Sequence, residues 1–359
     1  MKTAVRTRAA PRGIALIIVL ISIIVLSILA AGFAYSMKVE TKLARNASYD
    51  TELEWMGRSG VEYARWILGQ PKRDPFDSLN QIWAGGPGSW DDTNSPLAGI
   101  RVNDPVELGR GKFSVKIVDC ERKININLAN EPMLQQALVQ MGVDAAEASP
   151  IVNSILDWVD RDELSRVGGA ESDYYQGSTP PYYAKNGPID DISELLLIKD
   201  VTPELFWGPA CTNHSPAAFQ VKGGVFNRGQ EPGLYSAGLV DIFTPVSSGR
   251  INLNTASMAV LEMIPGIDQS MAAEIIRMRS GPDGVDGTED DTPLRNPGEL
   301  INVIPSSQIV GQLQRFCDVR STTFEVQVDV EVSGYKRHFV AVLGRGSPRD
   351  TQVLSFSAQ

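Results

Sequence analysis

The chain has 359 residues, of which 43% are hydrophobic, and it carries a formal net charge of −10. This length allows a sizeable core and two domains, or one domain with a large insertion. The acidic balance argues against nucleic acid as the main ligand, because affinity for a phosphate backbone comes largely from Lys and Arg.

The N-terminus combines a basic leader with a long apolar helix. Residues 1–12 contain four Lys or Arg side chains, and after Gly13 the stretch Ile14–Met37 has no charged side chain. A helix of this length spans about 36 Å, enough to cross a hydrocarbon core of about 30 Å. The basic leader is expected to stay cytoplasmic and to send the remainder of the chain outward.

Three interpretations of this segment are open. A secretory signal peptide would be cleaved near Gly32 and Ala34, but its apolar core is only about 7–15 residues long. A signal anchor would not be processed at all. We favour the third interpretation, cleavage between Gly13 and Ile14, because residues 11–20 resemble the leader of a type IV prepilin, which prepilin peptidase cuts after glycine.

The helix is expected to continue beyond the membrane to about residue 70, since 38–68 contains no proline and Pro71 supplies a stop. A loop-rich region follows. Strand-like alternation then appears in four segments, at 112–118, 324–332, 336–343 and 352–356. Strands at both ends of a helix-rich middle predict one sheet interrupted by a large helical insertion.

The middle of the chain contains an internal repeat. Lys123–Asn130 recurs 127 positions later as Arg250–Ser257. Each copy alternates Ile or Leu with Asn and then enters a helix. Its polar residues are explained as strand residues and as helix N-caps, with Asn127 or Asn130 in the first copy and Asn254, Thr255 or Ser257 in the second. The functional signal is therefore the duplication.

The second copy leads into a sequence that resembles a helix-hairpin-helix, with Gly266 at the tight turn. DNA-binding versions usually have a second glycine two positions later, so that backbone N–H groups can meet a phosphate. Here that position is Asp268, and Glu262 and Glu274 flank the basic residue Arg277. We expect a packing module.

Two acidic clusters are candidate Ca²⁺ sites, because Ca²⁺ takes about 6–8 oxygen ligands and short Asp/Gly loops let them converge. The first lies within 281–291 and contains Asp283, Asp286, Glu289, Asp290 and Asp291. Its spacing differs from that of an EF-hand, and a solvated acidic turn is the alternative. The second contains Asp157, Asp160, Glu171 and Asp173. Arg161 and Arg166 are positioned to neutralise part of its charge.

The remaining reactive side chains are few. Cys120, Cys211 and Cys317 form no CxxC motif, and in an oxidising exterior two of them can pair, with the choice of pair left open. His214 and His338 are remote in sequence, and no G-x-S-x-G, Walker or HExxH pattern occurs. We expect no enzyme.

Together these features resemble the K-type minor pseudopilins of bacterial type II secretion systems. The resemblance is carried by the leader, the duplicated motif and an ordered series of segments, namely Ile155–Asp160, Gly169–Tyr175, Pro181–Tyr182, Asn186–Asp190 and Ser193–Ile198. It implies an α+β, pilin-like fold, with a long N-terminal helix, an antiparallel sheet and a large α-helical insertion containing helix-hairpin-helix-like elements. It also implies bound Ca²⁺ and a place at the tip of a periplasmic pseudopilus.

The expected layout follows from this resemblance: a leader (1–13), a transmembrane segment (14–37), a periplasmic helix (38–70), the first part of the pilin-like domain (71–128), an inserted helical domain (129–249), the second repeat (250–316) and the C-terminal strands (317–359). The implied partners are the I-type and J-type minor pseudopilins, the major pseudopilin, prepilin peptidase and the inner-membrane assembly platform. No nucleic acid is expected.

Position 18 bears on the place of this subunit in a filament. In most pilins the fifth mature residue is a glutamate that pairs with a neighbouring subunit's N-terminal amine. Counted from Ile14, this position is Ile18. An unpaired charge there would be costly in lipid, and a subunit without the charge needs no partner ahead of it. We therefore expect an assembly-priming cap. The alternatives are a membrane-anchored helix-hairpin-helix DNA-binding protein of the competence type, and an anchored interaction domain without a filament.

Overall fold

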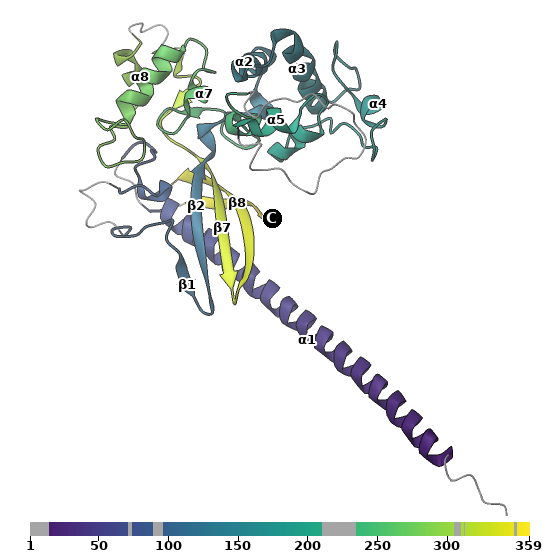
Figure 1. Ribbon diagram of the computed structural model, residues 1–359. Helices are drawn as coiled ribbons and strands as arrows, with labels where there is room; N and C mark the ends of the chain where they lie inside the picture. Colours follow the sequence, from purple (N-terminus) through teal and green to yellow (C-terminus); the bar gives the residue numbers. More distant parts are fainter. Residues whose placement is uncertain are drawn as a thin grey trace, which may run out of the picture.

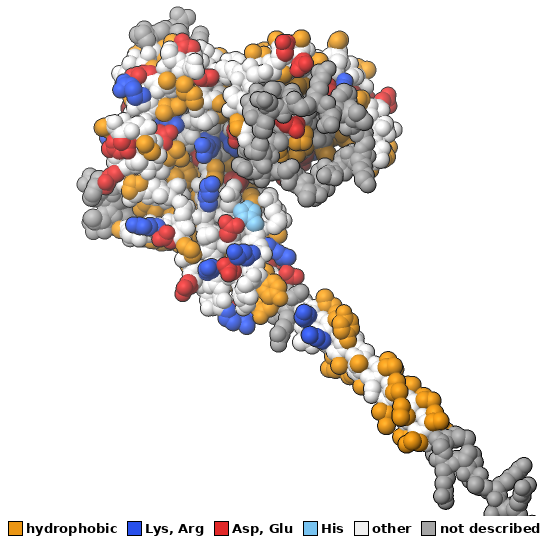
Figure 2. Space-filling model, in the orientation of Figure 1, with side chains coloured by type: hydrophobic (Ala, Val, Ile, Leu, Met, Phe, Trp, Pro, Cys, Tyr) orange, Lys and Arg blue, Asp and Glu red, His pale blue; other side chains and the backbone are white. Residues whose placement is uncertain are grey.

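A single long helix, α1 (Ile14–Leu68), leads into a folded body (Figure 1). The computed structural model describes residues 14–70, 74–88, 96–209, 235–304, 310–311, 313–347 and 350–359. Apolar side chains cover the free half of α1 (Figure 2), and its most apolar window has a mean hydropathy of 3.1. By length and composition, α1 is the one helix in this part of the chain that is able to cross a membrane. The proposed cleavage residue Gly13 lies outside the described residues.

A five-stranded antiparallel sheet packs against the other half of α1. Its strand order is β1–β2–β7–β8–β9, with bounds β1 (Val106–Leu108), β2 (Gly111–Asp119), β7 (Thr323–Val332), β8 (Tyr335–Ser347) and β9 (Asp350–Ala358). The four predicted strands lie within the last four of these. Every second residue of β7 from Phe324 is buried against α1, which explains the alternation in the sequence.

Two glycines let α1 approach the sheet closely. A Cβ atom at Gly57 would lie 2.6 Å from the ring of Phe339, and one at Gly60 would lie 2.4 Å from Val328. At the other end of this contact, Tyr49 stacks on Tyr335 with ring centroids 4.9 Å apart. The sheet is therefore fixed to the half of α1 that follows the apolar segment.

A large insertion lies between β2 and β7, at the end of α1 farthest from its apolar half (Figure 1). Its principal elements are β3 (Ile124–Asn125), α2 (Glu131–Met141), α3 (Ala145–Val159), α4 (Ser172–Tyr175), α5 (Pro203–Trp207), α6 (Leu239–Ile242), β4 (Phe243–Thr244), β5 (Ile251–Asn252), α7 (Met258–Leu261), α8 (Gln269–Arg279) and β6 (Cys317–Asp318). Short 3₁₀ segments join them at 120–122, 126–128, 192–197 and 297–302, and one more, 82–84, precedes β1. Buried residues of both predicted parts, 129–249 and 250–316, belong to one hydrophobic core.

The two repeat copies make the same long-range contact. The side-chain amide of Asn127 donates to Ile189 O at 2.9 Å and accepts from Ile189 N at 2.7 Å. In the second copy, Asn254 makes the same pair of bonds with Leu294, both at 2.9 Å. These asparagines therefore bind the backbone of distant segments. The suggestion that either caps a helix is wrong, because a buried amide is better satisfied by a backbone donor and acceptor together.

The equivalence extends to the helical hairpins that follow. Gly142 (φ 101°) ends α2, and Gly266 (φ 92°) forms the turn before α8. Asp144 then caps α3 by accepting from Ala146 N, and Asp268 caps α8 by accepting from Met271 N. Each copy is thus a short strand, a helix, a glycine turn and an aspartate-capped helix. Asn130 caps α2 as expected, whereas Ser257 precedes α7 without a side-chain cap bond.

A buried polar junction joins the insertion to the sheet. Asp119, at the end of β2, accepts from Thr255 Oγ1 at 2.6 Å, Ser321 Oγ at 2.7 Å and Asn252 Nδ2 at 3.1 Å. Burial, with Glu121 as the second cause, raises the pKa of Asp119 to about 7. The second repeat copy is therefore held to the end of the sheet by buried polar contacts.

Candidate metal centre

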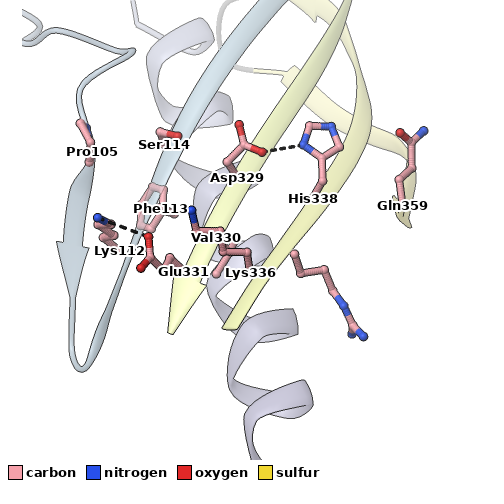
Figure 3. Close-up of a pocket in the computed structure, with 11 residues that line it drawn as sticks. Pro105, Lys112, Phe113, Ser114, Asp329, Val330, Glu331, Lys336, His338 and Gln359 are labelled. Atoms are coloured by element: carbon pink, nitrogen blue, oxygen red, sulfur yellow. Dashed lines mark hydrogen bonds and ion pairs between the residues drawn. The ribbon is translucent and has the colours of Figure 1, made fainter. Parts of the chain in front are cut away.

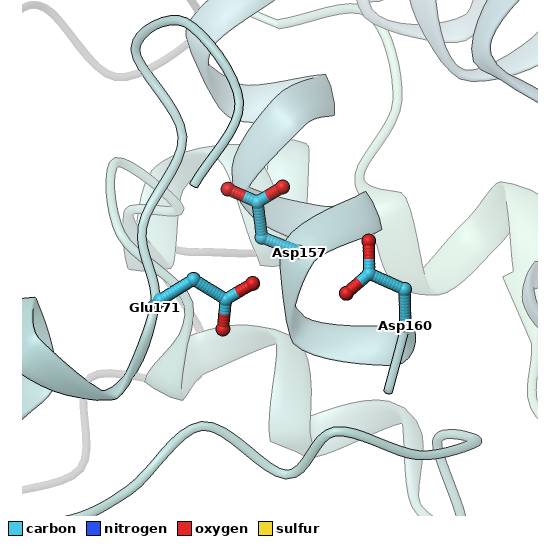
Figure 4. Close-up of side chains that lie close together, drawn as sticks. All are labelled: Asp157, Asp160 and Glu171. Carbon is cyan, nitrogen blue, oxygen red and sulfur yellow. The ribbon is translucent and has the colours of Figure 1, made fainter. Parts of the chain in front are cut away.

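Three carboxylates converge at the point where α3 ends and α4 begins (Figure 4). Asp157 lies in the last turn of α3, Asp160 is the residue that ends this helix, and Glu171 directly precedes α4. One ligand oxygen from each lies within 4.8 Å of the other two. Asp157 is fully buried and Glu171 is 4% exposed. The i, i+3 spacing of the two aspartates brings them to one helix face, as the sequence predicts.

Arg166 neutralises part of this charge. Its Nη1 lies 2.7 Å from Asp157 Oδ1 and also contacts Asp160 Oδ2, while its backbone N–H donates to Asp157 Oδ2 at 3.1 Å. These bonds, to Asp160 first and then to Asp157, raise the pKa of the guanidinium. One positive charge therefore faces three carboxylates.

Glu171 is the group left without compensation. Both of its carboxylate oxygens are buried and have no hydrogen-bond partner among the described residues, and the same holds for Asp160 Oδ1. Burial, followed by repulsion from Asp157 and Asp160, raises the pKa of Glu171 to about 7. Buried polar atoms without partners are costly, so this arrangement calls for a further positive group.

The donor set fits a divalent cation that prefers oxygen. Three carboxylates and one guanidinium leave a formal charge of −2 when all are ionised, which one Ca²⁺ would cancel. Asp157, Asp160 and Glu171 would hold the ion, and their unsatisfied oxygens would supply ligands. The ion would supply charge neutralisation and a link between the C-terminus of α3 and the N-terminus of α4.

Gly169 makes room for the site. A Cβ atom at this position would lie 2.0 Å from Asp157 Oδ2 and 2.9 Å from its Cγ. Any side chain here would push the Asp157 carboxylate from its place. Sequence reasoning did not single out Gly169, although a glycine two residues before a candidate ligand is a usable signal.

The raised pKa of Glu171 predicts a pH dependence. The pKa of this group is about 7 in the folded state and 4.5 as its ordinary value, so between these values the folded chain holds a proton that the unfolded chain releases. Stability of the metal-free chain therefore falls as pH rises from about 4.5 to 7. We expect Glu171→Gln to raise the melting temperature in chelator at pH 7.5 and to change it little at pH 4.5. An equal effect at both pH values would contradict the shift.

The other predicted ligands lie elsewhere. Asp173 is exposed on α4 and is not part of the converging group. Asp286 pairs with the buried Arg279, with Oδ2 2.6 Å from Nη2. Asp283, Asp290 and Asp291 accept hydrogen bonds within their own loop, and Glu289 is exposed. Within the described ranges the side chains of 283–291 form no second converging group. The converging carboxylates of Asp157, Asp160 and Glu171 are therefore the metal centre described here, and Ca²⁺ binding by the 281–291 loop stays a prediction.

The cysteines form no disulfide in the described part of the chain. Cys120 and Cys317 are both buried and free, so the option of pairing these two is wrong. Burial raises the pKa of Cys317 to about 12, with Asp318 as the second cause. Cys211 lies outside the described residues.

The open face of the sheet carries a shallow polar groove (Figure 3). Across it, Lys112 pairs with Glu331 at 3.4 Å, and Asp329 pairs with His338 at 2.8 Å. Four of the polar side chains that line the groove therefore bind one another in pairs, and the groove has the character of a solvated sheet face. His338 lies on β8, and its side chain is 33% exposed.

The helix-hairpin-helix gives little support to DNA binding. Asp268 lies at the start of α8, where a phosphate would have to bind, and its Oδ1 already accepts from Ser270 Oγ at 2.6 Å and Met271 N at 2.8 Å. These bonds lower the pKa of Asp268, so the group is negative at neutral pH. Arg277 pairs with Glu274. The alternative of a competence-type DNA-binding protein is not favoured.

Comparison with known proteins gives matches to two family models and to several named relatives. Residues 111–207 match the family model of type II secretion system protein K, and residues 246–286 match that of the helix-hairpin-helix motif. The type II secretion system protein K of Pseudomonas aeruginosa is 24% identical over 357 residues, which cover 97% of this chain and 93% of that protein. The Aeromonas hydrophila protein of the same name is 28% identical over 215 residues, 54% of this chain and 60% of that protein.

A solved structure shares the fold. It is a chain in the crystal structure of the GspK–GspI–GspJ complex of the type 2 secretion system from enterotoxigenic Escherichia coli. The two chains superpose with a TM-score of 0.62 at 18% identity, over 88% of this chain and 99% of that one. The long helix, the antiparallel sheet and the insertion thus form a known architecture.

Proposed function

This chain belongs to the type II secretion system protein K family, as a minor pseudopilin of the K type, and we propose that it caps the tip of the pseudopilus and primes its assembly. In this role it is a component of a secretion apparatus and no enzyme. It would support the export of proteins across the outer membrane.

The observation that carries this proposal is the position of the insertion. It lies beyond the sheet, at the end of α1 farthest from the apolar half, and it is wider than the sheet (Figure 1). A subunit stacked above this one would have to bring its own α1 through the space that the insertion occupies. Subunits below it meet no such obstacle. This shape suits the first subunit of a filament.

Ile18 supports the same place in the filament. It lies in the apolar part of α1 and is 58% exposed, with no charge to be paired by a subunit above. Cleavage by prepilin peptidase after Gly13 and N-methylation of Ile14 would precede assembly. The apolar half of α1 would cross the inner membrane once, with the leader in the cytoplasm and the body in the periplasm.

We further propose that the partners are the I-type and J-type minor pseudopilins, with the major pseudopilin below them and the assembly platform at the membrane. The likeness to a chain of the GspK–GspI–GspJ complex supports this. Ca²⁺ at Asp157, Asp160 and Glu171 would hold the insertion in one conformation in the periplasm.

Two measurements test the proposal. Mass spectrometry of the mature protein is expected to give a chain that starts at N-methylated Ile14, whereas a start at Met1 or near Tyr35 would contradict processing as a pseudopilin. Immunogold labelling of overproduced pseudopili is expected to place the wild-type chain at one end of the filament. Label along the whole shaft would overturn the cap.

A further inference from the structure

Arg166 occupies carboxylate oxygens that a divalent cation would need. Of the oxygens carried by the three converging carboxylates, Asp160 Oδ1 and both oxygens of Glu171 have no hydrogen-bond partner among the described residues. Asp157 Oδ1 and Asp160 Oδ2 both accept from Arg166 Nη1. Because Ca²⁺ takes about 6–8 oxygen ligands, the free oxygens are a small part of what the ion requires while the guanidinium stays in place.

The guanidinium of Arg166 is bound in a way that lets it leave. Its side chain is 40% exposed, and within the described part of the chain its side-chain hydrogen bonds come from Nη1 alone. Arg279 gives the contrast, because its side chain is 4% exposed and three of its nitrogens are bonded. Its Nε and Nη2 donate to Asp286, and its Nη1 donates to Leu253 O. Arg279 is therefore a permanent structural cation, whereas Arg166 is a replaceable one.

The backbone around Arg166 is held independently of its side chain. The backbone N–H of Arg166 donates to Asp157 Oδ2 at 3.1 Å, and the side-chain amide of Asn153 donates to Val167 O at 2.9 Å. Neither bond involves the guanidinium. The guanidinium can therefore turn toward solvent while the backbone of the loop keeps its position beside the carboxylates.

We propose that Arg166 is an internal stand-in for Ca²⁺. In the metal-free chain its guanidinium pairs with Asp157 and Asp160, and Ca²⁺ displaces it from these oxygens on binding. The inference rests on the proposed function, in which Ca²⁺ binds at this site in the periplasm. The exchange frees Asp157 Oδ1 and Asp160 Oδ2, which join the oxygens that already lack a partner.

The exchange gives the site a Ca²⁺ threshold. Asp157 is fully buried, so its charge would be costly without a counter-ion. Arg166 supplies that counter-ion until Ca²⁺ is available. Because Ca²⁺ must break the ion pairs of Arg166 in order to bind, these pairs set the Ca²⁺ concentration at which the site fills. The site therefore responds to the Ca²⁺ level of the compartment that holds it.

Isothermal titration of the full chain in detergent with Ca²⁺ tests the competition. Arg166→Gln is expected to bind Ca²⁺ about tenfold more tightly than the wild type, because the ion no longer has to break charge-assisted hydrogen bonds. In chelator the same variant is expected to melt at a lower temperature, since Asp157 then lacks its cation. Arg161→Gln removes the same charge from the same loop, at a residue that forms no ion pair among the described residues, and should bind Ca²⁺ as the wild type does. A purely structural arginine would behave differently, because its loss would weaken both Ca²⁺ binding and stability.

The wild-type chain gives a second readout that does not depend on the folding of a variant. Phenylglyoxal modifies accessible guanidinium groups, and mass spectrometry of the digested chain gives the rate at each arginine. Arg166 is expected to react faster in Ca²⁺ than in chelator, whereas Arg161 should react equally in both. An unchanged rate at Arg166, or equal or weaker Ca²⁺ binding by Arg166→Gln, would overturn the stand-in role alone. If the wild type binds no Ca²⁺, the Ca²⁺ site of the proposed function fails together with this inference.

Discussion

Replacing Arg345 with methionine is expected to lower the free energy of unfolding by about 3–5 kcal/mol, as is typical when one partner of a buried ion pair is removed. Arg345 is 6% exposed and its Nη2 contacts the buried Asp77. It also donates to Ser321 O at 2.6 Å, and its guanidinium lies 4.7 Å from the centre of the Phe324 ring. The side chain thus ties β8 to β7 and to the segment before the sheet.

The loss of stability follows from the acidic side chains that remain buried in the variant. Burial lowers the pKa of Arg345 to about 10, so the group is still charged at neutral pH. Three acidic side chains are buried at this junction, namely Asp77, Asp119 and Glu121. Methionine fills much of the volume of arginine but removes its charge. It would leave the Asp77 carboxylate without its cation in a low-dielectric setting.

Urea unfolding of the full chain in detergent, followed by tryptophan fluorescence, measures this effect. The double variant Asp77→Asn with Arg345→Met should recover part of the loss, since it removes the Asp77 charge together with its cation. Lys336→Met, at an exposed position of the same strand, is the control and should change stability by less than about 0.5 kcal/mol. A loss below about 1 kcal/mol for Arg345→Met would mean that the pair contributes little.

Local patterns were enough to predict most of the pilin-like part of the fold. Strict alternation in 324–332 predicts β7 because one face of that strand is buried and the other is not. β1 was missed because three residues carry no readable period. Proline at position 71 was expected to end α1, and the helix does end just before it, at Leu68.

The long-range hydrogen-bond partners of the repeat asparagines could not be predicted from the sequence. Asn127 and Asn254 were read as strand residues or caps, but their amides bind Ile189 and Leu294, which lie 62 and 40 positions away. The repeat showed that the two asparagines were equivalent and gave no sign of what they contact. Nothing in the sequence indicated that Arg345 is buried, because a basic residue in a strand usually faces solvent.

The candidate metal centre could be predicted only in part, because it too depends on a long-range contact. Asp157 and Asp160 share a helix face by spacing alone, so their convergence could be foreseen. Glu171 reaches them only because the loop after α3 folds back, and Asp173, two residues later, does not. The acidic loop 281–291 has the richer composition, yet its carboxylates are used by backbone N–H groups and by Arg279. The composition of a segment shows how many carboxylate oxygens it carries, but not where those oxygens point in the folded chain.

The substitution Gly169→Ala is expected to weaken Ca²⁺ binding by at least tenfold. The new methyl group would lie 2.0 Å from Asp157 Oδ2, closer than atoms can approach, so the carboxylate must move. Asp157 is fully buried and is bonded to Arg166, so it has no alternative position that keeps these contacts. The backbone at Gly169 needs no positive φ, so alanine itself is tolerated there.

Isothermal titration of the chelator-treated chain with Ca²⁺, together with the melting temperature in Ca²⁺ and in chelator, measures this loss. Gly187→Ala is the matched control, because its Cβ would lie no closer than 3.7 Å to any neighbour, and it should bind Ca²⁺ as the wild type does. Without Ca²⁺, Gly169→Ala should also melt below the wild type, because the displaced Asp157 loses contacts with Arg166, so the titration, and not the melting temperature alone, measures the effect on the metal. Equal Ca²⁺ affinity in Gly169→Ala and Gly187→Ala would show that Asp157 does not bind the metal. No Ca²⁺ binding by the wild type would show that this is not a metal site.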